Sequence, residues 1–189
     1  AMVRRAKAAG LPVTAEVTTH HFTLTDAACA SYDPVFKVHP PLRTDSDLAA
    51  VRAGLADGTV DAVATDHAPH APHAKERTFD EAPPGMLGLE TAFALTLGES
   101  GLDLPEVLAV LSWRPAAIAG IADRHGAAVV PGAPANLCVV DPDETWMVSG
   151  AAMASRSHNT PYEGRTLRGR VRHTIRAGEP VVIDGEAQR

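Results

Sequence analysis

The sequence predicts an α/β fold of strand–helix units, followed by a smaller unit made of strands. Short apolar strands are expected at residues 13–17 and 61–65, with a helix at residues 45–57 between them. Strands that alternate with helices are typical of a parallel sheet. In the last third of the chain, glycines and prolines separate short β-prone runs. We therefore expect βα units over residues 1–128 and a small β domain over residues 129–189.

Start and stop signals predict where the helices lie. The opening AMVRRAKAAG favours a helix that Gly10 closes, with Pro12 just beyond it. The segment Thr44–Asp47 offers a capping-box-like start, and apolar residues then recur at roughly helical spacing until Gly58. Further helices are expected near residues 26–31, 87–97, 105–111 and 115–120.

The remaining segments are expected to be loops or strands. Residues 32–43 carry three prolines and cannot form a helix. Residues 67–85 lack a helical period, and a loop of this length inside a compact domain is usually functional. The β unit is expected to contain strands at residues 136–140, 171–175 and 181–183.

Composition and charge argue against several classes of protein. The 189 residues are 45% hydrophobic and 21% charged, as in ordinary globular proteins. Asp and Glu (23) outnumber Lys and Arg (17), the net charge is −6, and no basic cluster predicts a nucleic-acid partner. The chain has no apolar run of the roughly 18 residues that span a membrane, and no signal-peptide stretch at its start. With two distant cysteines and no disulfide framework, we expect a cytoplasmic protein without membrane contact.

The segment Thr65–His70 carries the densest candidate chemistry. It places Asp66, His67 and His70 in one loop at the end of a strand predicted to be parallel, where barrel enzymes keep their catalytic groups. A carboxylate together with imidazoles suits a divalent ion such as zinc, and Asp66 could serve as both metal ligand and base. The alternative is that Asp66 caps the following turn and the histidines are solvated loop residues. The spacing by itself leaves both interpretations open.

The adjacent His20 and His21 follow the first predicted strand. On an extended segment they would point to opposite sides, so at most one is expected to face a site at the strand's end. The alternative for either one is a hydrogen-bonded histidine of the core or of a loop. Glu16, on the strand itself, is a candidate buried acid or a residue on the outward face.

Two loops add polar groups that could meet a ligand. His39 could hydrogen-bond a ligand and Arg43 could clamp a carboxylate, or both could be surface residues. At Pro84–Gly85 the backbone could approach a ligand closely, because glycine has no Cβ. The alternative for this pair is a turn ahead of a helix.

Several motifs agree with one family. The chain resembles the carboxyl-terminal part of bacterial dihydroorotases, enzymes of the amidohydrolase superfamily, in the segments LPVTAEVTTHHFTL (11–24), FKVHPPLR (36–43), DAVATDHAPH (61–70), PPGMLGLET (83–91) and NTPYEG (159–164). The most distinctive elements are APH after TDH, and PPLR upstream. The resemblance implies that residues 13–17 and 61–65 are the last two strands of a (β/α)8 barrel, beside which a small carboxyl-terminal β domain packs.

The resemblance also implies roles for individual residues. Asp66 matches the metal-linked catalytic aspartate, which accepts the nucleophile's proton as the ring amide is attacked and returns it to the leaving nitrogen. His70 matches the substrate-binding histidine, and Pro84 with Gly85 match a backbone contact to the pyrimidine ring. His39 stands where these enzymes usually carry a substrate-contacting asparagine. The implied reaction of pyrimidine biosynthesis interconverts the small molecules dihydroorotate and N-carbamoyl-aspartate with a divalent metal, expected to be Zn²⁺.

The family's other metal ligands lie before the region that this chain covers. They are an HxH pair, a lysine or aspartate, and two further histidines, and His20 and His21 follow a later strand than these. A complete barrel needs about 250 residues. The chain also starts without Met and in an apparent helix, so we expect a fragment of a longer protein that is inactive alone.

Two alternatives to an active dihydroorotase stay open at this point. One is a non-catalytic, dihydroorotase-like scaffold that binds a partner enzyme. The other is a related enzyme for a different cyclic amide, a hydantoinase or an allantoinase, because one fold hosts many such reactions. Assembly into a homo-oligomer is compatible with each of them.

Overall fold

A computed structural model describes residues 1–126 and 128–188, which form a mixed α/β structure. Its helices are α1 (Met2–Ala8), α2 (Asp45–Ala56), α3 (Pro72–Lys75), α4 (Ala92–Glu99), α5 (Leu104–Leu108) and α6 (Arg114–Ile118). Its strands are β1 (Glu16–Thr18), β2 (Ala62–Ala64), β3 (Leu137–Met147), β4 (Thr166–Arg176), β5 (Glu179–Ile183) and β6 (Glu186–Ala187). Short helical turns of other types are η1 (Thr19–Phe22), η2 (Asp26–Ser31), η3 (Pro34–Phe36), η4 (Ala109–Trp113) and η5 (Gly150–Ala152).

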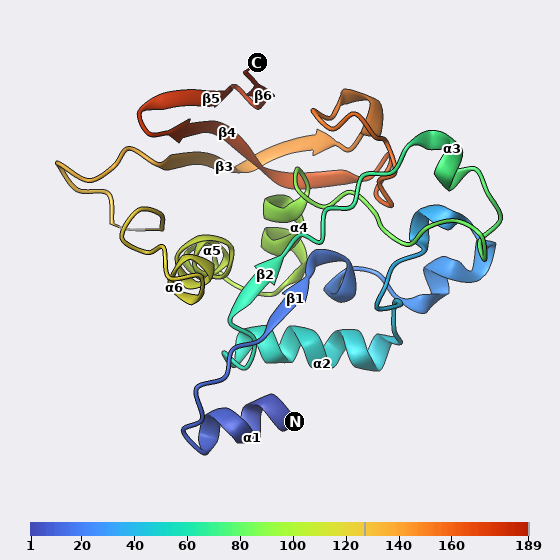
Figure 1. The fold of residues 1–189 in the computed structure, drawn as a ribbon, viewed down its shortest axis with the longest axis horizontal. Helices are drawn as coiled ribbons and strands as arrows, with labels where there is room; N and C mark the ends of the chain where they lie inside the picture. Colours follow the sequence, from blue (N-terminus) through green and yellow to red (C-terminus); the bar gives the residue numbers. More distant parts are fainter. Residues whose placement is uncertain (127, 189) are drawn as a thin grey trace.

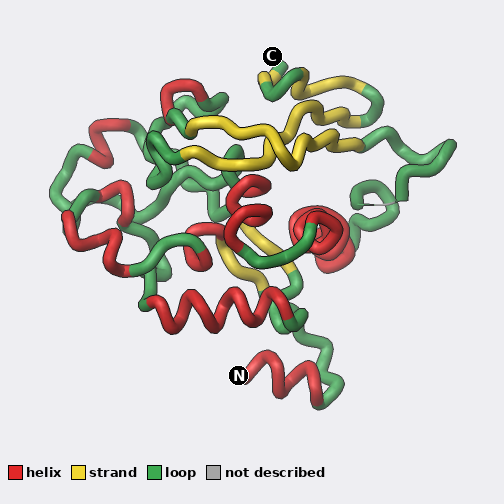
Figure 2. Tube along the Cα trace, turned by 180° about the vertical axis from the view of Figure 1, so that it is seen from behind, coloured by secondary structure: helices red, strands yellow, loops and turns green. Residues whose placement is uncertain are grey.

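The elements are stacked in layers (Figure 1). Helix α4 lies between the sheet of β3, β4, β5 and β6 and the pair β1–β2, and α2 lies beyond that pair. The view from behind shows the same order of layers, with long loops gathered at one side of the molecule (Figure 2). None of the helices in the described part of the chain is long and apolar enough to span a membrane.

Strands β1 and β2 pair in parallel, as their separation by a helix predicts. Thr18 lies opposite Ala64, so the two strands end at the same edge. Strand β1 begins later than the run predicted at residues 13–17, because a local turn ties the Val13 N–H to the Leu11 carbonyl at 2.8 Å.

The predicted signals of helix α2 are confirmed. The Asp47 carboxylate accepts hydrogen bonds from the Thr44 N–H (3.3 Å) and from the Thr44 hydroxyl (2.8 Å), which closes the first turn. The helix ends at Ala56, and Gly58 adopts a left-handed φ of 72° just beyond it.

One loop prediction and one helix prediction were wrong in their limits. Residues 67–85 are not entirely a loop, because Pro72 starts the single turn of α3 at a position where its missing N–H costs nothing. Helix α4 starts at Ala92 rather than near residue 87. The residues before it are extended: Met86 forms a parallel bridge with His67, and the Leu87 N–H reaches out to another loop.

The helices predicted at 105–111 and 115–120 are joined in the structure. Helix α5, the wider π turn η4 and helix α6 follow one another without a break. Pro115 lies in the first turn of α6 and has no N–H to donate, which fits a widened turn directly before it.

The carboxyl-terminal sheet is antiparallel, in the order β3, β4, β5, β6. All three predicted strands are confirmed, and each of β3, β4 and β5 is longer than predicted. Register shifts between Val139 and Val140, and between Asp141 and Thr145, let β3 stay paired with β4 past Pro142. The division of the chain near residue 128 stays a prediction.

Two apolar clusters hold the layers together. Leu95 of α4 packs with Val148, Tyr162 and Leu167, which joins the helix to the antiparallel sheet. On the other side, one cluster joins α2, β2, η1 and η4 through Leu55, Val63, Phe22 and Val110. Tyr162 is 2% exposed, and its hydroxyl hydrogen-bonds the Thr23 hydroxyl (2.7 Å) just after η1.

Burial raises the pKa of Tyr162 to about 12, so the protonated phenol is favoured in the folded state. Between pH 10 and 12 the unfolded state loses this proton first, and stability is lost as the pH rises through that window. We expect the free energy of unfolding to fall by up to about 1.4 kcal/mol per pH unit there. Denaturant titrations of wild type and Tyr162→Phe at a series of pH values measure the difference. Parallel pH profiles for the two proteins would contradict the prediction.

Candidate functional site

The candidate site begins where the two parallel strands end. Asp66 follows β2 by two residues, and the 19–22 turn follows β1 directly, so both lie at the same edge. Asp66 has a left-handed φ of 45°, which is unusual for a residue other than glycine, and its side chain is 44% exposed. The loop therefore presents this carboxylate to solvent rather than burying it.

His20 faces Asp66 from the neighbouring strand end. Its Nε2 lies 3.8 Å from Asp66 Oδ2, and among the described residues this buried nitrogen has no hydrogen-bond partner. The side chain is 1% exposed, and burial, with a smaller effect from His21, lowers its pKa to about 3. His20 is thus a neutral imidazole aimed at the carboxylate.

His21 connects two segments of the chain by hydrogen bonds. The Thr18 hydroxyl donates to its Nδ1 (2.6 Å), and its Nε2 donates to the Pro40 carbonyl (3.0 Å), so it ties the proline-rich loop to the end of β1. Only His20 faces Asp66, in line with the expectation that at most one would, but the expected extended segment was wrong. Both histidines lie in the short helix η1, and their ring centroids are 4.5 Å apart, so the side chains stay in contact instead of pointing to opposite sides.

The histidines of the 65–70 segment are not free in solvent. Nδ1 of His67 accepts the N–H groups of Gly88 (3.2 Å) and Leu89 (3.3 Å), so its ring links this loop to the segment before α4. Gly88 is required there, because a Cβ would lie 2.2 Å from the Thr65 carbonyl oxygen. The ring of His67 therefore holds backbone together rather than projecting into the site.

His70, Pro84 and Gly85 are in direct contact. Nε2 of His70 donates to the Pro84 carbonyl at 3.0 Å. Gly85 has a φ of 134°, and a Cβ there would lie 2.6 Å from Ala68 Cβ and 2.7 Å from His70 Nε2. The absence of a side chain at this position thus lets the imidazole lie against the backbone.

Asn159 completes this cluster and was missed by reasoning from residue types. Its side chain contacts the backbone of Ala68, His70 and Gly85 and is 7% exposed. The only signal was its place at the head of the NTPYEG segment. Nothing in the spacing of that segment predicts which loops it meets, because the contacts join residues about 70 to 90 positions apart.

The other candidates lie outside this cluster. His39 is exposed, its peptide bond to Pro40 is cis, and no hydrogen bond of its side chain is found among the described residues. The Arg43 side chain is 66% exposed, and its Nε pairs with the Asp47 carboxylate at 3.5 Å. Glu16 is exposed, as the outward-facing interpretation expected.

The described part of the chain holds no group of three or more His, Cys, Asp or Glu side chains arranged to bind a metal. Asp66 is the carboxylate best placed to be one ligand, with the unpartnered His20 nitrogen behind it. The described residues thus offer one candidate ligand at this edge and no complete metal site.

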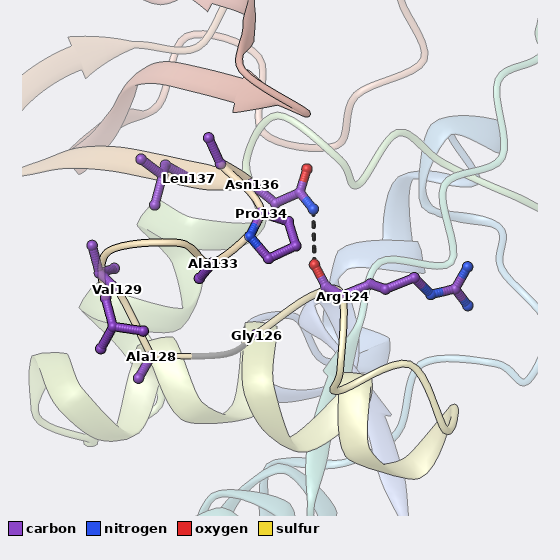
Figure 3. A pocket seen from close by; sticks show the side chains of 10 residues that line it. Arg124, Gly126, Ala128, Val129, Ala133, Pro134, Asn136 and Leu137 are labelled. Carbon is purple, nitrogen blue, oxygen red and sulfur yellow. Dashed lines mark hydrogen bonds between the residues drawn. The ribbon is translucent and has the colours of Figure 1, made fainter.

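A separate pocket lies in the 124–137 region. It measures about 180 Å³, and apart from Arg124 and Asn136 its described lining side chains are small or apolar. Figure 3 shows the Arg124 side chain pointing away from Ala133 and Val129, while Asn136 donates to the Arg124 carbonyl at 2.8 Å. The described lining of this pocket therefore offers few polar groups to a ligand, and the Asn136 amide is already engaged with the Arg124 carbonyl.

Comparison with known proteins gives a consistent result. A model of the Amidohydrolase family matches residues 3–181. Dihydroorotases of Streptomyces coelicolor and Mycobacterium leprae are 51% and 50% identical to the chain over 98% and 94% of its length. The chain covers 44% and 42% of those two proteins, so it spans less than half of these curated relatives.

Two solved structures with a similar fold are hydantoinases. The L-hydantoinase from Arthrobacter aurescens superposes on the whole chain with a TM-score of 0.90 at 26% identity. A D-hydantoinase from Thermus sp. gives a TM-score of 0.83 over 98% of the chain, also at 26% identity. The chain covers 43% of each.

The Gly85 geometry generates a stability prediction. Gly85→Ala places a Cβ 2.6–2.7 Å from Ala68 and His70 at a φ of 134°, so we expect it to lower the free energy of unfolding by more than about 2 kcal/mol. Gly164→Ala is the matched control, because its φ of 73° is also positive but no atom lies within 4 Å of the new Cβ. That variant is expected to cost only about 1 kcal/mol. Urea titrations compare them, and equal losses would contradict the steric argument.

Proposed function

The chain belongs to the amidohydrolase family, and on this premise we propose that it is the carboxyl-terminal part of a dihydroorotase. The proposed enzyme is a metal-dependent cyclic amide hydrolase that interconverts dihydroorotate and N-carbamoyl-aspartate in pyrimidine biosynthesis. The observation that carries the proposal is 51% identity to a dihydroorotase across 98% of this chain. The contact of His70 with Pro84 and Gly85 supports it, since His70 lies in the same loop as the exposed Asp66.

The proposal includes the architecture of the complete protein. Strands β1 and β2 would be the last two of a (β/α)8 barrel, and residues 129–189 would form the small β domain beside it. The parallel pairing of β1 and β2 supports this, because barrel strands are parallel and carry functional groups at their carboxyl ends. Asp66 lies at such an end.

Asp66 is the proposed ligand of this chain to a divalent metal, expected to be Zn²⁺. Its carboxylate fits the role because it is exposed, and because an unpartnered buried imidazole nitrogen lies 3.8 Å behind it. The remaining ligands would come from residues outside this chain. A bound metal would supply Lewis-acid activation of the attacking water and of the amide carbonyl.

Asp66 also acts as the proposed proton carrier. One carboxylate oxygen accepts the proton of the water that attacks the ring carbonyl, and the same proton passes to the ring nitrogen as the C–N bond breaks. The exposure of the carboxylate supports this, because a general base must reach the attacking water. The buried His20 Nε2 lies 3.8 Å from this carboxylate on its protein side.

The substrate is proposed to lie against His70, Pro84 and Gly85. With Nε2 of His70 donating to the Pro84 carbonyl, Nδ1 is the ring atom left to accept a hydrogen bond from a ligand. The backbone at Gly85 can approach a planar ring closely because it carries no side chain. His39 is the proposed replacement for an asparagine contact, and its exposed side chain is free to meet a ligand.

Another cyclic amide is the second candidate substrate. The hydantoinase structures share the fold at 26% identity, which is about half the identity to the dihydroorotases. That difference favours dihydroorotate over a hydantoin. A cytoplasmic homo-oligomer is the proposed state of the complete enzyme.

The test is carbamoyl-aspartate cyclisation by the complete polypeptide that contains this chain, with its metal content measured alongside. Asp66→Asn keeps the shape of the side chain but removes its charge and basicity. We expect activity to fall by at least about 100-fold, together with weaker metal binding. Asp80→Asn is the control, because Asp80 lies in an exposed loop and the one side-chain hydrogen bond found for its carboxylate among the described residues comes from the nearby Thr78 hydroxyl.

Three results would count against the proposal. A wild type that is folded and metal-loaded yet inactive on carbamoyl-aspartate would contradict dihydroorotase activity, and hydantoin and allantoin would then be assayed. A metal-free, inactive wild type would favour the non-catalytic scaffold. Full activity in Asp66→Asn would remove Asp66 from the mechanism.

A further inference from the structure

One side chain joins the two loops of the proposed substrate site to the carboxyl-terminal part of the chain. Asn159 lies in the loop between η5 and β4, and its side chain is 7% exposed. It reaches residues 68–70, which follow β2, and residue 85, which precedes α4.

Each polar atom of the Asn159 side chain is used. Its Oδ1 accepts the His70 N–H at 3.1 Å. Its Nδ2 donates to the Ala68 carbonyl at 3.0 Å and to the Gly85 carbonyl at 3.3 Å. Its backbone carbonyl accepts the Leu87 N–H at 3.1 Å. An amide fits this pattern because it combines one acceptor with two donors.

The Asn159 loop is itself firmly held. Nδ1 of the preceding His158 donates to the Gly150 carbonyl at 2.7 Å, and the Thr160 N–H bonds to the His158 carbonyl at 2.8 Å. Tyr162, three residues after Asn159, is buried in the apolar cluster that joins α4 to the antiparallel sheet. The amide of Asn159 is thus presented from an anchored segment, as a side chain that orients other groups must be.

We propose that Asn159 is a positioning residue, which sets the distance between His70 and Gly85 in the substrate site. This inference rests on the proposed function, because it assumes that these two residues contact the substrate. The Ala68 and His70 backbone lies on one side of the amide and Gly85 on the other. The carboxyl-terminal part of the chain thereby helps shape the site through a side chain that does not touch substrate.

The variant Asn159→Asp tests the proposal with little change in volume. A carboxylate still accepts the His70 N–H, but it loses both donors and sets a negative oxygen against the carbonyls of Ala68 and Gly85. We expect the KM for dihydroorotate in the complete enzyme to rise about tenfold or more, because small displacements of positioning groups are costly. We expect kcat to change less than about threefold, because the Asp66 carboxylate is outside the network.

Asn136→Asp is the matched control. Asn136 also tethers two backbone segments through its amide, donating to the Arg124 carbonyl (2.8 Å) and accepting from the Ala177 N–H (2.9 Å). It lines the separate pocket of Figure 3 rather than the proposed site. A loss of stability without a change in KM is expected from this variant. Equal changes of KM in both variants would reduce Asn159 to a general stabilising residue and overturn the proposal.

Amide hydrogen exchange supplies a measurement that does not depend on activity. In Asn159→Asp the Leu87 N–H should exchange faster than in wild type, because repulsion between the carboxylate and the Gly85 carbonyl displaces the 85–87 segment from the Asn159 backbone carbonyl. If exchange is faster but the complete enzyme has no dihydroorotase activity, the role of Asn159 in joining the two loops is supported and the proposed function is contradicted. Unchanged exchange and unchanged KM in an active enzyme would overturn the role of Asn159 alone.

Discussion

The parallel register of β1 with β2 is the constraint on which the site depends. Because Thr18 lies opposite Ala64, the turn after β1 and the loop after β2 leave the sheet at one edge. That edge brings the buried His20 to within 3.8 Å of Asp66, although the two residues are far apart in the sequence. A shift of one residue in this pairing would turn the side chains of one strand to the opposite face and separate the two groups.

Helix α4 and the antiparallel sheet support this edge of the β1–β2 pair through a small number of specific contacts. Helix α4 packs its apolar side against the antiparallel sheet, and the Glu99 carboxylate at its end pairs with both Arg52 of α2 and Arg165 before β4. These side chains are partly exposed, so the ion pairs contribute little to the free energy of folding. Their main effect is to hold the three segments in a fixed relative position. Tyr162 adds a buried link from the same region to Thr23, just beyond the turn that carries His20. Apolar packing, ion pairs and the Tyr162–Thr23 hydrogen bond thus all connect the upper layers to the region around this edge.

Local signals predicted much of the fold because they act over a few residues. The capping box at Thr44, the stop at Gly58 and the β-prone runs of the last third need no distant partner, and the structure confirms each. Predictions failed where a distant contact overrode the local pattern. Residues 87 and 88 were predicted to begin a helix, yet they lie outside it because the Leu87 N–H bonds to the Asn159 carbonyl and the Gly88 N–H bonds to His67 Nδ1.

The sequence alone determined the α/β class, the order of most elements and the segments that carry candidate chemistry, because residue type and spacing are local properties. It also placed Asp66 at a strand end and Gly85 beside a proline. Only the tertiary structure decided that His20 rather than His21 faces Asp66, and that His70 lies on Gly85. It alone brought Asn159 between the two loops. These arrangements depend on contacts between residues tens of positions apart, and no local pattern encodes which distant backbone group a side chain will meet.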